Sequence, residues 1–319
     1  MANYDVFNGD ADGICALQQL RLQSPRQAQR VTGLKRDIDL LQRISPAAGD
    51  QITVLDISLD KNRDALVAAL DVGTQVFYAD HHYPGEIPEH AALECHIDPA
   101  ADTCTSLIVN QVLKRAQARW AVVGAFGDNF DQAANELGRG IGLGDADLAQ
   151  LRQLGICLNY NGYGFELEDL LYHPVDLFAL IHPFADPLAF IENESGYADL
   201  LAQYQDDLHR AESSEADSVS EAGAVYLLPN ESWARRIVGV MGNDLAQQYP
   251  DRAHALLVDM GDGNQRVSVR APYNRKQGAD DLCRQFPSGG GRKAAAGINQ
   301  LPDTSVAQFV ETFNLQFGG

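Results

Sequence analysis

Aspartate and histidine side chains follow four apolar segments of the chain, which end near residues 7, 55, 79 and 127. In chain order, these polar residues are Asp10, Asp12, Asp56, Asp80, His81, His82 and Asp128. Divalent ions such as Mg2+ and Mn2+ prefer carboxylate oxygens, and an imidazole ligand shifts the preference toward Mn2+. We therefore expect these side chains to converge on one metal site.

Such a site could hold two ions and carry out phosphoryl-transfer chemistry. Two ions about 4 Å apart need a bridging carboxylate, and together they clamp the attacking and leaving oxygens of an in-line displacement. Asp10 and Asp12 are two residues apart, so an extended backbone would point both carboxylates the same way. Each of the two could then serve one ion.

Each motif has an ordinary structural alternative when it is taken alone. Asp10-Ala11-Asp12-Gly13 also fits a turn or part of a calcium loop. Asp56 fits a helix N-cap, and Asp128 fits a turn. The presence of all four motifs, each at the end of an apolar segment, favours the shared site.

Apolar runs alternate with amphipathic stretches over the first 130 residues. Strands are predicted at 3–7, 31–35, 52–56, 76–80 and 93–97, and helices at 14–22, 63–70 and 105–118. Residues 120–126 are apolar and fit either a helix or a strand. The alternation predicts an α/β fold with a mostly parallel sheet and flanking helices, in which ligands bind beyond the carboxyl ends of the strands.

The composition limits the partners of the chain. It has 319 residues and a formal net charge of -20, which argues against a large basic face for duplex nucleic acid. A small nucleotide held by metal ions and a few cations is compatible with this charge. The five cysteines are scattered, no apolar run reaches about 18 residues, and the first residues do not form a secretory signal. We expect a cytoplasmic protein that does not contact a membrane.

An acidic, serine-rich stretch at residues 213–221 separates two sequence patterns. We predict a catalytic domain over 1–195, a helical and acidic linker over 196–222, and a smaller α/β domain with a mixed sheet over 223–319. Within the last domain, Gly261-Asp262-Gly263-Asn264 separates two strand patterns and predicts a hairpin.

Positive charge gathers in this second domain. Between Gly263 and Gln300, seven Lys and Arg residues stand against two Asp residues, a local excess of five. This stretch contains Gly289, Gly290, Gly291, Arg292 and Lys293, and consecutive glycines followed by cations can present backbone N–H groups to an anion. A solvated hairpin is the alternative, but in combination with the metal motifs we favour phosphate recognition.

With these motifs in this order, the sequence resembles the DHH phosphoesterase family. That family includes RecJ-type exonucleases, nanoRNases, cyclic di-AMP phosphodiesterases and family II pyrophosphatases. The DHH motifs lie before residue 130. The segment from about residue 223 resembles the DHH-associated C-terminal domain through Val267-Ser268-Val269-Arg270 and the glycine-rich stretch. The resemblance implies a DHH catalytic domain followed by a substrate-binding domain.

The resemblance also implies a role for each residue. It implies two Mn2+ ions, with Mg2+ and Co2+ as alternatives. The first ion would be held by Asp10 and Asp56, and the second by Asp12, Asp56, His81 and Asp128. Asp80 would orient a histidine and His82 would contact phosphate, so that the catalytic residues would be Asp56, Asp80 and His82. The implied substrate-binding residues are His82, Arg270, Gly289, Gly290, Gly291, Arg292 and Lys293.

Three positions depart from the family pattern. Val6 stands where many members have a histidine, and Asn8 stands where RecJ-type members have an aspartate, which leaves Asn8 as a weak oxygen ligand or an indirect contact. The first ion would then be held loosely or only together with substrate. Arg292 stands where the family has a histidine, and it would keep a phosphate contact without donating a proton near neutral pH.

We therefore expect a metal-dependent phosphodiesterase, in which a metal-activated hydroxide hydrolyses short oligonucleotides or linear or cyclic dinucleotides. A processive DNA exonuclease is less favoured because the sequence has no long basic track. The alternatives are a phosphomonoesterase for a bisphosphorylated nucleotide and a nucleotide-binding regulatory protein with a weakened metal centre. Oligomerisation is left open.

Overall fold

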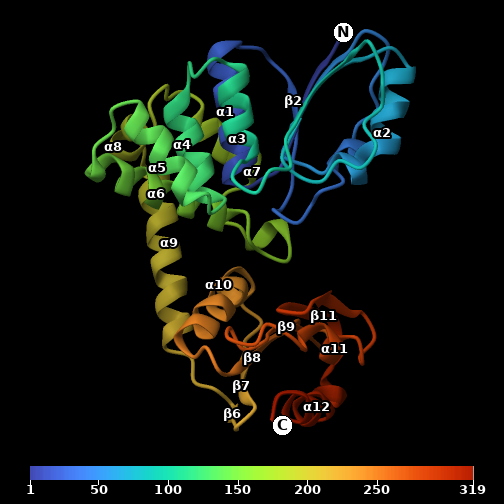
Figure 1. Cartoon of the computed structure of the whole chain (residues 1–319), viewed down its shortest axis with the longest axis vertical. Helices are drawn as coiled ribbons and strands as arrows, with labels where there is room; N and C mark the ends of the chain where they lie inside the picture. The colour runs from blue at the N-terminus through green and yellow to red at the C-terminus, as the bar shows by residue number, and fades with distance from the viewer. Residues whose placement is uncertain (319) are drawn as a thin grey trace. The chain divides into compact units, whose positions relative to one another are not determined.

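A parallel β-sheet organises the N-terminal unit, residues 1–204, in the computed structural model, which describes residues 1–318 (Figure 1). The strand order is β2-β1-β3-β4-β5, and all neighbouring strands are parallel. The strands are β1 Asn3–Phe7, β2 Gln29–Val31, β3 Gln51–Leu55, β4 Gln75–Asp80 and β5 Leu93–Ile97. The parallel α/β architecture predicted from the sequence is confirmed.

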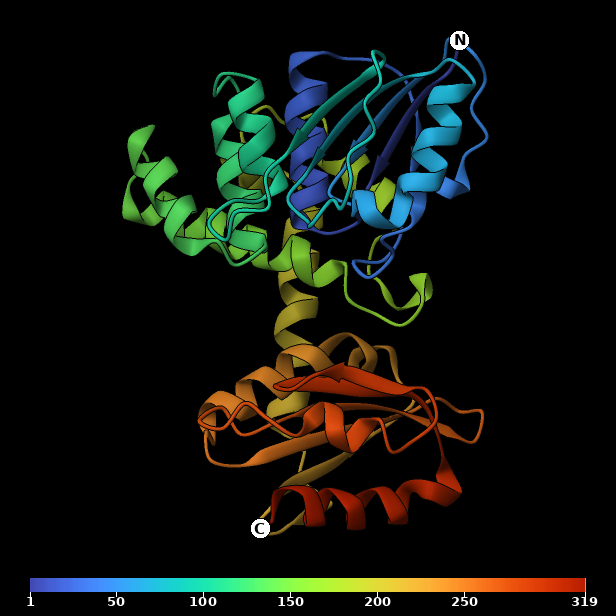
Figure 2. The same cartoon turned by 45° about the vertical axis from the view of Figure 1, so that its right-hand side comes forward.

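Helices cover both faces of this sheet (Figure 2). The helices are α1 Ala11–Gln23, α2 Leu59–Asp71, α3 Thr105–Val112, α4 Ala118–Gly127, α5 Asp131–Gly140, α6 Asp145–Asn161, α7 Pro174–Ile181, α8 Pro187–Asn193 and α9 Ser195–Glu212, with 3-10 turns η1 Leu40–Arg43 and η2 Leu167–Asp169. α2 and η1 share one hydrophobic core with the sheet, and α1, α3 and α4 share the other.

Alternate residues of the central strands face these two cores. Phe7, Leu55 and Ala79 lie in register across β1, β3 and β4 and are buried on the α1 side. The residue before each of them is buried on the α2 side. Strands that are covered on both faces must be apolar at nearly every position. This requirement explains the continuous apolar runs that lead into the polar motifs.

One predicted strand ends earlier than expected. The segment predicted at 31–35 forms β2 only as far as Val31, and residues 32–35 lie beyond the carboxyl end of the strand. The Lys35 backbone N–H donates to Gly162 O at 3.0 Å instead of joining the sheet. This edge strand therefore delivers a loop to the same side of the sheet as the metal motifs.

The apolar segment 120–126 belongs to helix α4, so that the fourth motif follows a helix and not a strand. Trp120 and the residues that follow it up to Gly127 are all buried. A helix that is apolar on all sides is stable when it is enclosed by neighbouring elements. Asp128 is the C-cap residue of this helix. The expectation that all four motifs lie at strand ends is therefore wrong for Asp128.

Close packing of three helices brings the end of α4 to the sheet edge. A Cβ atom on Gly127 would lie 2.3 Å from Ala11 Cβ, and one on Gly124 would lie 2.2 Å from Ser106 Oγ. A Cβ atom on Gly155 of α6 would lie 2.5 Å from Val123 O. These distances are too short for any side chain, so glycine allows α1, α3 and α6 to approach α4.

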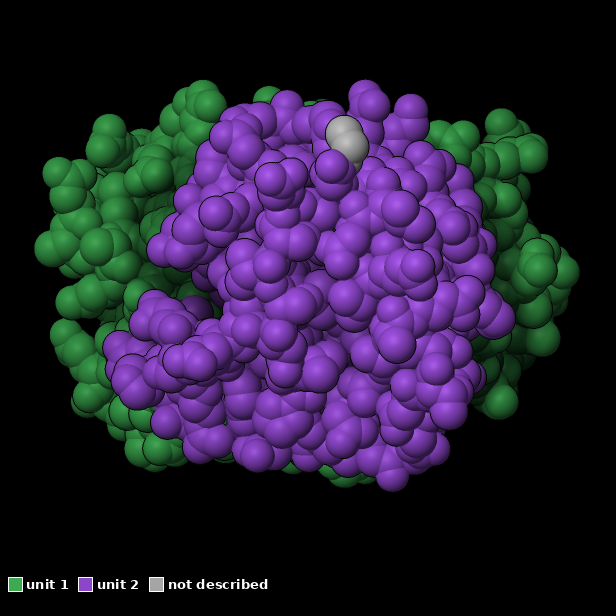
Figure 3. Space-filling model, turned by 90° about the horizontal axis from the view of Figure 1, so that it is seen from below, with its two compact units in different colours: residues 1–204 green, residues 205–319 purple. Residues whose placement is uncertain are grey.

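The C-terminal unit, residues 205–319, has a mixed sheet of order β10-β11-β9-β8-β7-β6 (its atoms are purple in Figure 3). β7 and β8 are parallel, and the other neighbouring pairs are antiparallel. Its elements are β6 Ser218–Val219, β7 Gly223–Leu228, α10 Ser232–Gln248, β8 Ala253–Asp259, β9 Asn264–Arg270, α11 Ala279–Cys283, β10 Gly289–Arg292, β11 Ala295–Pro302, η3 Asp303–Ser305 and α12 Val306–Phe317. The predicted mixed sheet and the hairpin of β8 and β9 are confirmed.

The boundary between the two units falls after Tyr204, within α9. It lies inside the segment 196–222 that the sequence marks as a helical and acidic linker. The serine-rich part of that segment is more than a connector, because β6 pairs with β7.

The glycine-rich stretch forms a strand where a loop is expected from the sequence. Gly289–Arg292 is β10 and pairs with β11 in an antiparallel hairpin. A Cβ atom on Gly289 would lie 1.8 Å from Cys283 O, so only glycine fits there. A Cβ atom on Gly290 would meet no atom within 4 Å. The backbone of β10 therefore lies close to Cys283 of α11 at Gly289 and is open at Gly290.

Among residues 1–318, no helix combines the length and the apolar character that crossing a bilayer requires.

The first prediction concerns a buried ion pair that ties α1 to β1. Arg21 Nε donates to Asp5 Oδ2 at 2.9 Å and Arg21 Nη2 to Asp5 Oδ1 at 2.6 Å. Asp5→Ala should lower the free energy of unfolding by about 3–5 kcal/mol, because Arg21 stays buried without its carboxylate. Urea denaturation measures the loss. Asp145→Ala is the control, since this carboxylate is 92% exposed in its pair with Arg139 and should contribute less than about 1 kcal/mol. Equal losses in the two variants would contradict the role of burial.

Candidate metal centre

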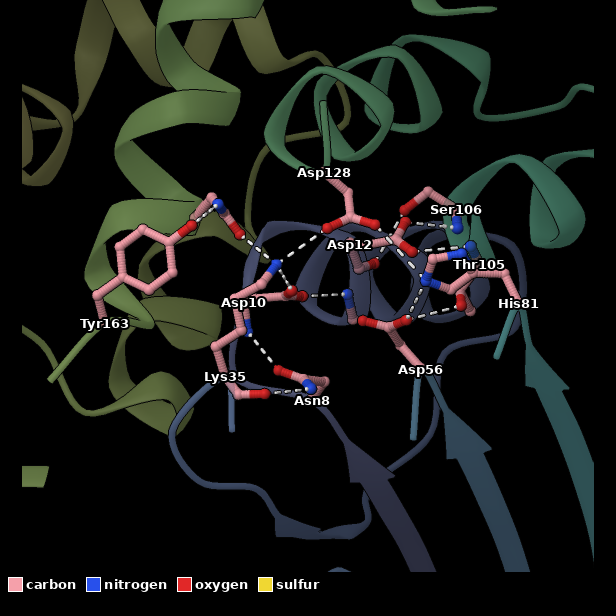
Figure 4. Close-up of polar contacts among 12 residues, drawn as sticks. Asn8, Asp10, Asp12, Lys35, Asp56, His81, Thr105, Ser106, Asp128 and Tyr163 are labelled. Atoms are coloured by element: carbon pink, nitrogen blue, oxygen red, sulfur yellow. Dashed lines mark hydrogen bonds and ion pairs between the residues drawn. The ribbon is translucent and has the colours of Figure 1, made fainter. Parts of the chain in front are cut away.

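The polar residues at one edge of the parallel sheet lie close together (Figure 4). His81 Nε2 is 3.5 Å from Asp56 Oδ1 and 3.5 Å from Asp128 Oδ2. Two sets of donor atoms, each within 4.8 Å of one another, could hold a metal ion: Asp12, His81 and Asp128, and Asp56, His81 and His82. Three strand ends and the end of α4 thus meet as one cluster.

Asp56 occupies a constrained position directly after β3. Its φ of 59° lies in the left-handed region, which few residues other than glycine adopt and which Asp and Asn tolerate best. Its N–H donates to Ala79 O at 3.0 Å, and its Oδ1 accepts from Thr105 Oγ1 at 2.9 Å. Backbone and carboxylate are both held, and the residue is only 2% exposed.

Asp12 joins α1 to the beginning of α3. Its Oδ2 accepts from Thr105 N and its Oδ1 accepts from Ser106 N, both at 2.7 Å. The first N–H groups of a helix have no partner inside the helix, so a carboxylate is favourable there. Each carboxylate oxygen keeps a second lone pair, so Asp12 can hold α3 and still bind an ion.

Lys35 reaches into the cluster from the loop after β2 (Figure 4). Its Nζ is 2.5 Å from Asp10 Oδ2, 2.9 Å from Asp128 Oδ1 and 2.8 Å from Asn159 Oδ1. Asn159 lies in the last turn of α6, and its Nδ2 donates to Tyr163 Oη at 3.0 Å. The ammonium therefore joins the start of α1, the end of α4 and the last turn of α6 at one point.

The carboxylates differ in the charge around them. Burial and the neighbouring carboxylates of Asp12, Asp10 and Asp128 raise the pKa of Asp56 well above its usual range. Burial would also raise the pKa of Asp10, but the Lys35 ammonium outweighs it and leaves that pKa lowered. Burial and Asp10 raise the pKa of Asp128, although Lys35 opposes them. Negative charge is thus compensated at Asp10 and remains in excess at Asp56.

Asp80 contacts the second histidine of the motif. Asp80 Oδ1 is 2.6 Å from His82 Nδ1, and Asp80 is completely buried. Burial lowers the pKa of His82, but the hydrogen bond and charge of Asp80 outweigh this effect and raise it. The sequence predicts that Asp80 orients a histidine, and in the structure its partner is His82. This contact leaves His82 Nε2 for another partner.

Asn8 holds backbone on both sides of its amide. Its Oδ1 accepts from Asp10 N at 3.1 Å, and its Nδ2 donates to Lys35 O at 3.0 Å. Asn8 was considered as a weak metal ligand. In this structure its amide instead fixes the relative position of Asp10 and Lys35.

Two of the predicted substrate residues of the C-terminal unit, Arg270 and Arg292, share one face of its sheet. Arg270 of β9 lies opposite Ala295 of β11, and Ala295 lies opposite Arg292 of β10, so both arginines are on the same face. Arg270 Nε donates to Asn243 Oδ1 of α10 at 2.8 Å. Burial and the nearby Arg292 lower the pKa of Arg270. Arg292 and Lys293 are exposed.

Sequence analysis missed four residues of this cluster: Lys35, Thr105, Ser106 and Asn159. Lys35 had a usable signal, because a cation beyond a strand of the parallel sheet reaches the same edge as the metal motifs. A strand predicted through residue 35 concealed it. Asn159 gives no signal in sequence, since it reaches the cluster only through the packing of α6.

Solved structures with the same fold are known. No family model matches the chain, and no curated protein matches it. A solved RecJ exonuclease bound to manganese has a TM-score of 0.64 at 15% identity, covering 99% of this chain and 90% of that chain. RecJ of Thermus thermophilus in complex with Mn2+ has a TM-score of 0.64 at 16% identity. It covers 99% of this chain, which spans 52% of that one.

The pGpG-specific phosphodiesterase PggH from Vibrio cholerae matches along its whole length. Its TM-score is 0.59 at 12% identity, with 100% of this chain and 99% of that chain covered. The chain has the RecJ-like DHH phosphoesterase fold. At these identities the likeness is one of fold.

The donor set of this DHH fold fits a divalent cation. Asp12, Asp56, His81 and Asp128 offer oxygen and imidazole nitrogen donors, the combination that suits Mn2+ and its neighbours. The excess negative charge around Asp56 needs a cation that Lys35 does not supply. Asp12, His81 and Asp128 form one donor set for the ion, and Asp56 lies beside it, with its Oδ1 3.5 Å from His81 Nε2.

The second prediction follows from the crowding of carboxylates. Asp56→Asn tolerates the left-handed backbone and removes one charge, so the metal-free variant should unfold at a higher temperature than the metal-free wild type. Saturating Mn2+ should stabilise the wild type, by about 2.7 kcal/mol at 100 times Kd, and leave the variant nearly unchanged. Thermal unfolding with Mn2+ or with a chelator measures both effects.

Asp64→Asn, an exposed position in α2, removes the same charge away from the cluster and should behave like the wild type. A full Mn2+ response in Asp56→Asn would exclude Asp56 as a ligand.

Proposed function

We propose that the chain is a Mn2+-dependent phosphodiesterase that hydrolyses short oligonucleotides or linear or cyclic dinucleotides. The observation that carries this proposal is the convergence of Asp12, Asp56, His81 and Asp128 at the carboxyl edge of the parallel sheet. The fold shared with RecJ structures that contain manganese supports the choice of ion. The shared fold of PggH, a pGpG-specific phosphodiesterase, supports the reaction class.

His82 would bind the phosphate that reacts. Asp80 holds its Nδ1, which fixes the ring and leaves Nε2 to meet a phosphate oxygen. The raised pKa of His82 favours the imidazolium form, which stabilises negative charge on that oxygen. A bound divalent ion would lower the pKa of water and polarise the phosphoryl oxygens.

Arg270, Arg292 and Lys293 would bind further phosphate groups of the substrate. An arginine presents paired N–H donors that match phosphate oxygens, and Ser268 holds Arg270 through a 2.9 Å contact to Nη1. Gly290 adds open backbone beside Arg292 in β10. Gly289 and Gly291 would contribute indirectly, because a Cβ atom at these positions would clash with Cys283 O and with Ala296, respectively.

The charge of the chain favours a short substrate. With a net charge of -20, a long polyanion would be repelled over most of the surface, whereas a few phosphates can be held by local cations and the metal centre. Trinucleotides, dinucleotides and cyclic dinucleotides satisfy this condition.

The third prediction tests hydrolysis directly. The protein with Mn2+ should cleave bis(p-nitrophenyl) phosphate, and His81→Ala or Asp56→Ala should lower kcat/KM by at least about a thousandfold, because several kcal/mol of charge stabilisation would be lost. His90→Ala, an exposed histidine of the same unit, should retain the wild-type rate. Equal turnover in the wild type, His81→Ala and Asp56→Ala would refute catalysis at this centre.

One observation favours a second candidate, a nucleotide-binding protein without turnover. Lys35 engages Asp10 and Asp128, which reduces the donors available to metal. This candidate predicts that the wild type binds dinucleotides and hydrolyses none of them with Mn2+. A side-by-side screen of dinucleotides, cyclic dinucleotides and bisphosphorylated nucleotides separates it from both a diesterase and a monoesterase.

The fourth prediction tests the arginine face of the C-terminal unit. Arg292→Ala should raise KM for dinucleotides about tenfold or more, since a hydrogen bond to a charged group contributes roughly 1.5–3 kcal/mol. Arg284→Ala is the matched control, because Arg284 caps α11, which packs on the opposite face of the sheet beside Val267 and Val269. Unchanged kinetics in Arg292→Ala would mean that this residue does not meet the substrate.

A further inference from the structure

The Lys35 ammonium is saturated by the protein. A lysine ammonium has three N–H donors, and three side-chain oxygens, those of Asp10, Asp128 and Asn159, lie within 2.9 Å of Nζ. No donor of this group remains for a substrate phosphate. Lys35 therefore acts on the carboxylates of the centre, as a bound cation would.

The position of Lys35 is built into the fold. Its N–H donates to Gly162 O at 3.0 Å, and its carbonyl accepts from Asn8 Nδ2 at 3.0 Å. Asn8 also accepts from the N–H of Asp10, so the backbones of Lys35 and its partner are fixed to each other. A surface lysine that happened to fold inward would lack these contacts.

Asp128 divides its two oxygens between the ammonium and the metal-binding cluster. Its Oδ1 is 2.9 Å from Lys35 Nζ, and its Oδ2 is 3.5 Å from His81 Nε2. A carboxylate that bridges two ions divides its oxygens in the same manner. The ammonium thus binds one oxygen of Asp128 and leaves the other on the side of His81.

The residues that lead into Asp10 offer little to a second ion. Val6 is fully buried in the apolar core on the α2 side. Both ends of the Asn8 amide are engaged, and Asp10 Oδ1 accepts from Gly13 N at 3.0 Å. Asp10 Oδ2 accepts from Lys35 Nζ at 2.5 Å, so a second ion that bound Asp10 would lie close to the positive charge of the ammonium and be repelled by it.

We propose that Lys35 takes the place of a second metal ion, so that the centre binds a single divalent ion through Asp12, Asp56, His81 and Asp128. The second ion that the family resemblance implies would bind Asp10, and the Lys35 ammonium beside that carboxylate would repel it. The two-ion centre expected from the family resemblance is thereby replaced by an ion and an ammonium. This inference deepens the proposed function, because it concerns the same centre.

The fifth prediction is the metal content of the full-length protein. After equilibration with Mn2+ and removal of free ion, elemental analysis should give one manganese per chain. Electron paramagnetic resonance should give the spectrum of an isolated Mn2+ ion. Two manganese ions per chain, or the spectrum of an exchange-coupled pair, would overturn the proposal, and so would the absence of bound manganese.

Variants of Lys35 test whether its ammonium is what excludes a second metal ion. In Lys35→Ala the freed oxygens of Asp10 and Asp128 should admit a second ion, so the metal content should rise from one toward two per chain. Lys35→Arg keeps the positive charge and should stay at one. Lys61→Ala, an exposed lysine of the same unit, should also stay at one. A content of one in folded Lys35→Ala would show that Lys35 is not what excludes the second ion. If that variant fails to fold, the wild-type content still decides the proposal.

Metal content is measured without substrate, so this inference and the proposed function can fail separately. One manganese per chain without hydrolysis of any phosphodiester would support the replacement of the second ion by Lys35 and refute the proposed phosphodiesterase activity. Hydrolysis by a protein that holds two manganese ions would refute the replacement of the second ion by Lys35 and support the proposed phosphodiesterase activity.

Discussion

Four carboxylates that lie together in a buried place repel one another unless positive charge or N–H donors are placed among them. The fold meets this condition differently for each one. Asp10 and Asp128 share the Lys35 ammonium, and Asp12 receives two N–H groups from the start of α3. Asp56 accepts a hydrogen bond from the Thr105 hydroxyl but has no nearby cation comparable to Lys35 among the residues that the structure describes. Burial and the neighbouring carboxylates therefore raise its pKa. Negative charge is therefore least compensated on the side of the cluster near His81. The donor atoms that could bind an ion lie on the same side.

The geometry of the cluster depends on elements that have little chemistry of their own. Parallel strands end at one edge, and their register sets the spacing of the motifs that follow β1, β3 and β4. Gly124, Gly127 and Gly155 let α1, α4 and α6 approach closely enough for Asp128 and Asn159 to reach the same point. A helix moved outward by one methyl group would separate the oxygens that Lys35 joins. Packing at apolar positions therefore controls the electrostatics of the centre.

Much of this arrangement could be predicted from the sequence, because a strand buried on both faces leaves a continuous apolar run and a polar residue at its end is easily noticed. Asp10, Asp56 and His81 were found in this way. Asp128 was found for a reason that is only partly correct, since a fully buried helix and a buried strand have the same apolar signature. Lys35 was missed because a strand was predicted through residue 35, whereas β2 ends at Val31 and Lys35 lies in the loop beyond it. Asn159 was missed because its place depends on a helix that joins the cluster through tertiary packing.

An ammonium and a divalent ion are not equivalent, and the difference limits what each side of the centre can do. The ammonium carries one positive charge and three N–H donors, each of which needs an acceptor. Unlike a metal ion, it has no open coordination position. It can hold Asp10 and Asp128 in place, but it cannot polarise a phosphoryl oxygen while all its donors are engaged. In the proposed reaction, charge that develops on a phosphate would be met by the remaining ion and by His82. In the one-ion centre that we propose, the side chains that bind the substrate would therefore contribute more of the charge stabilisation than in a two-ion centre.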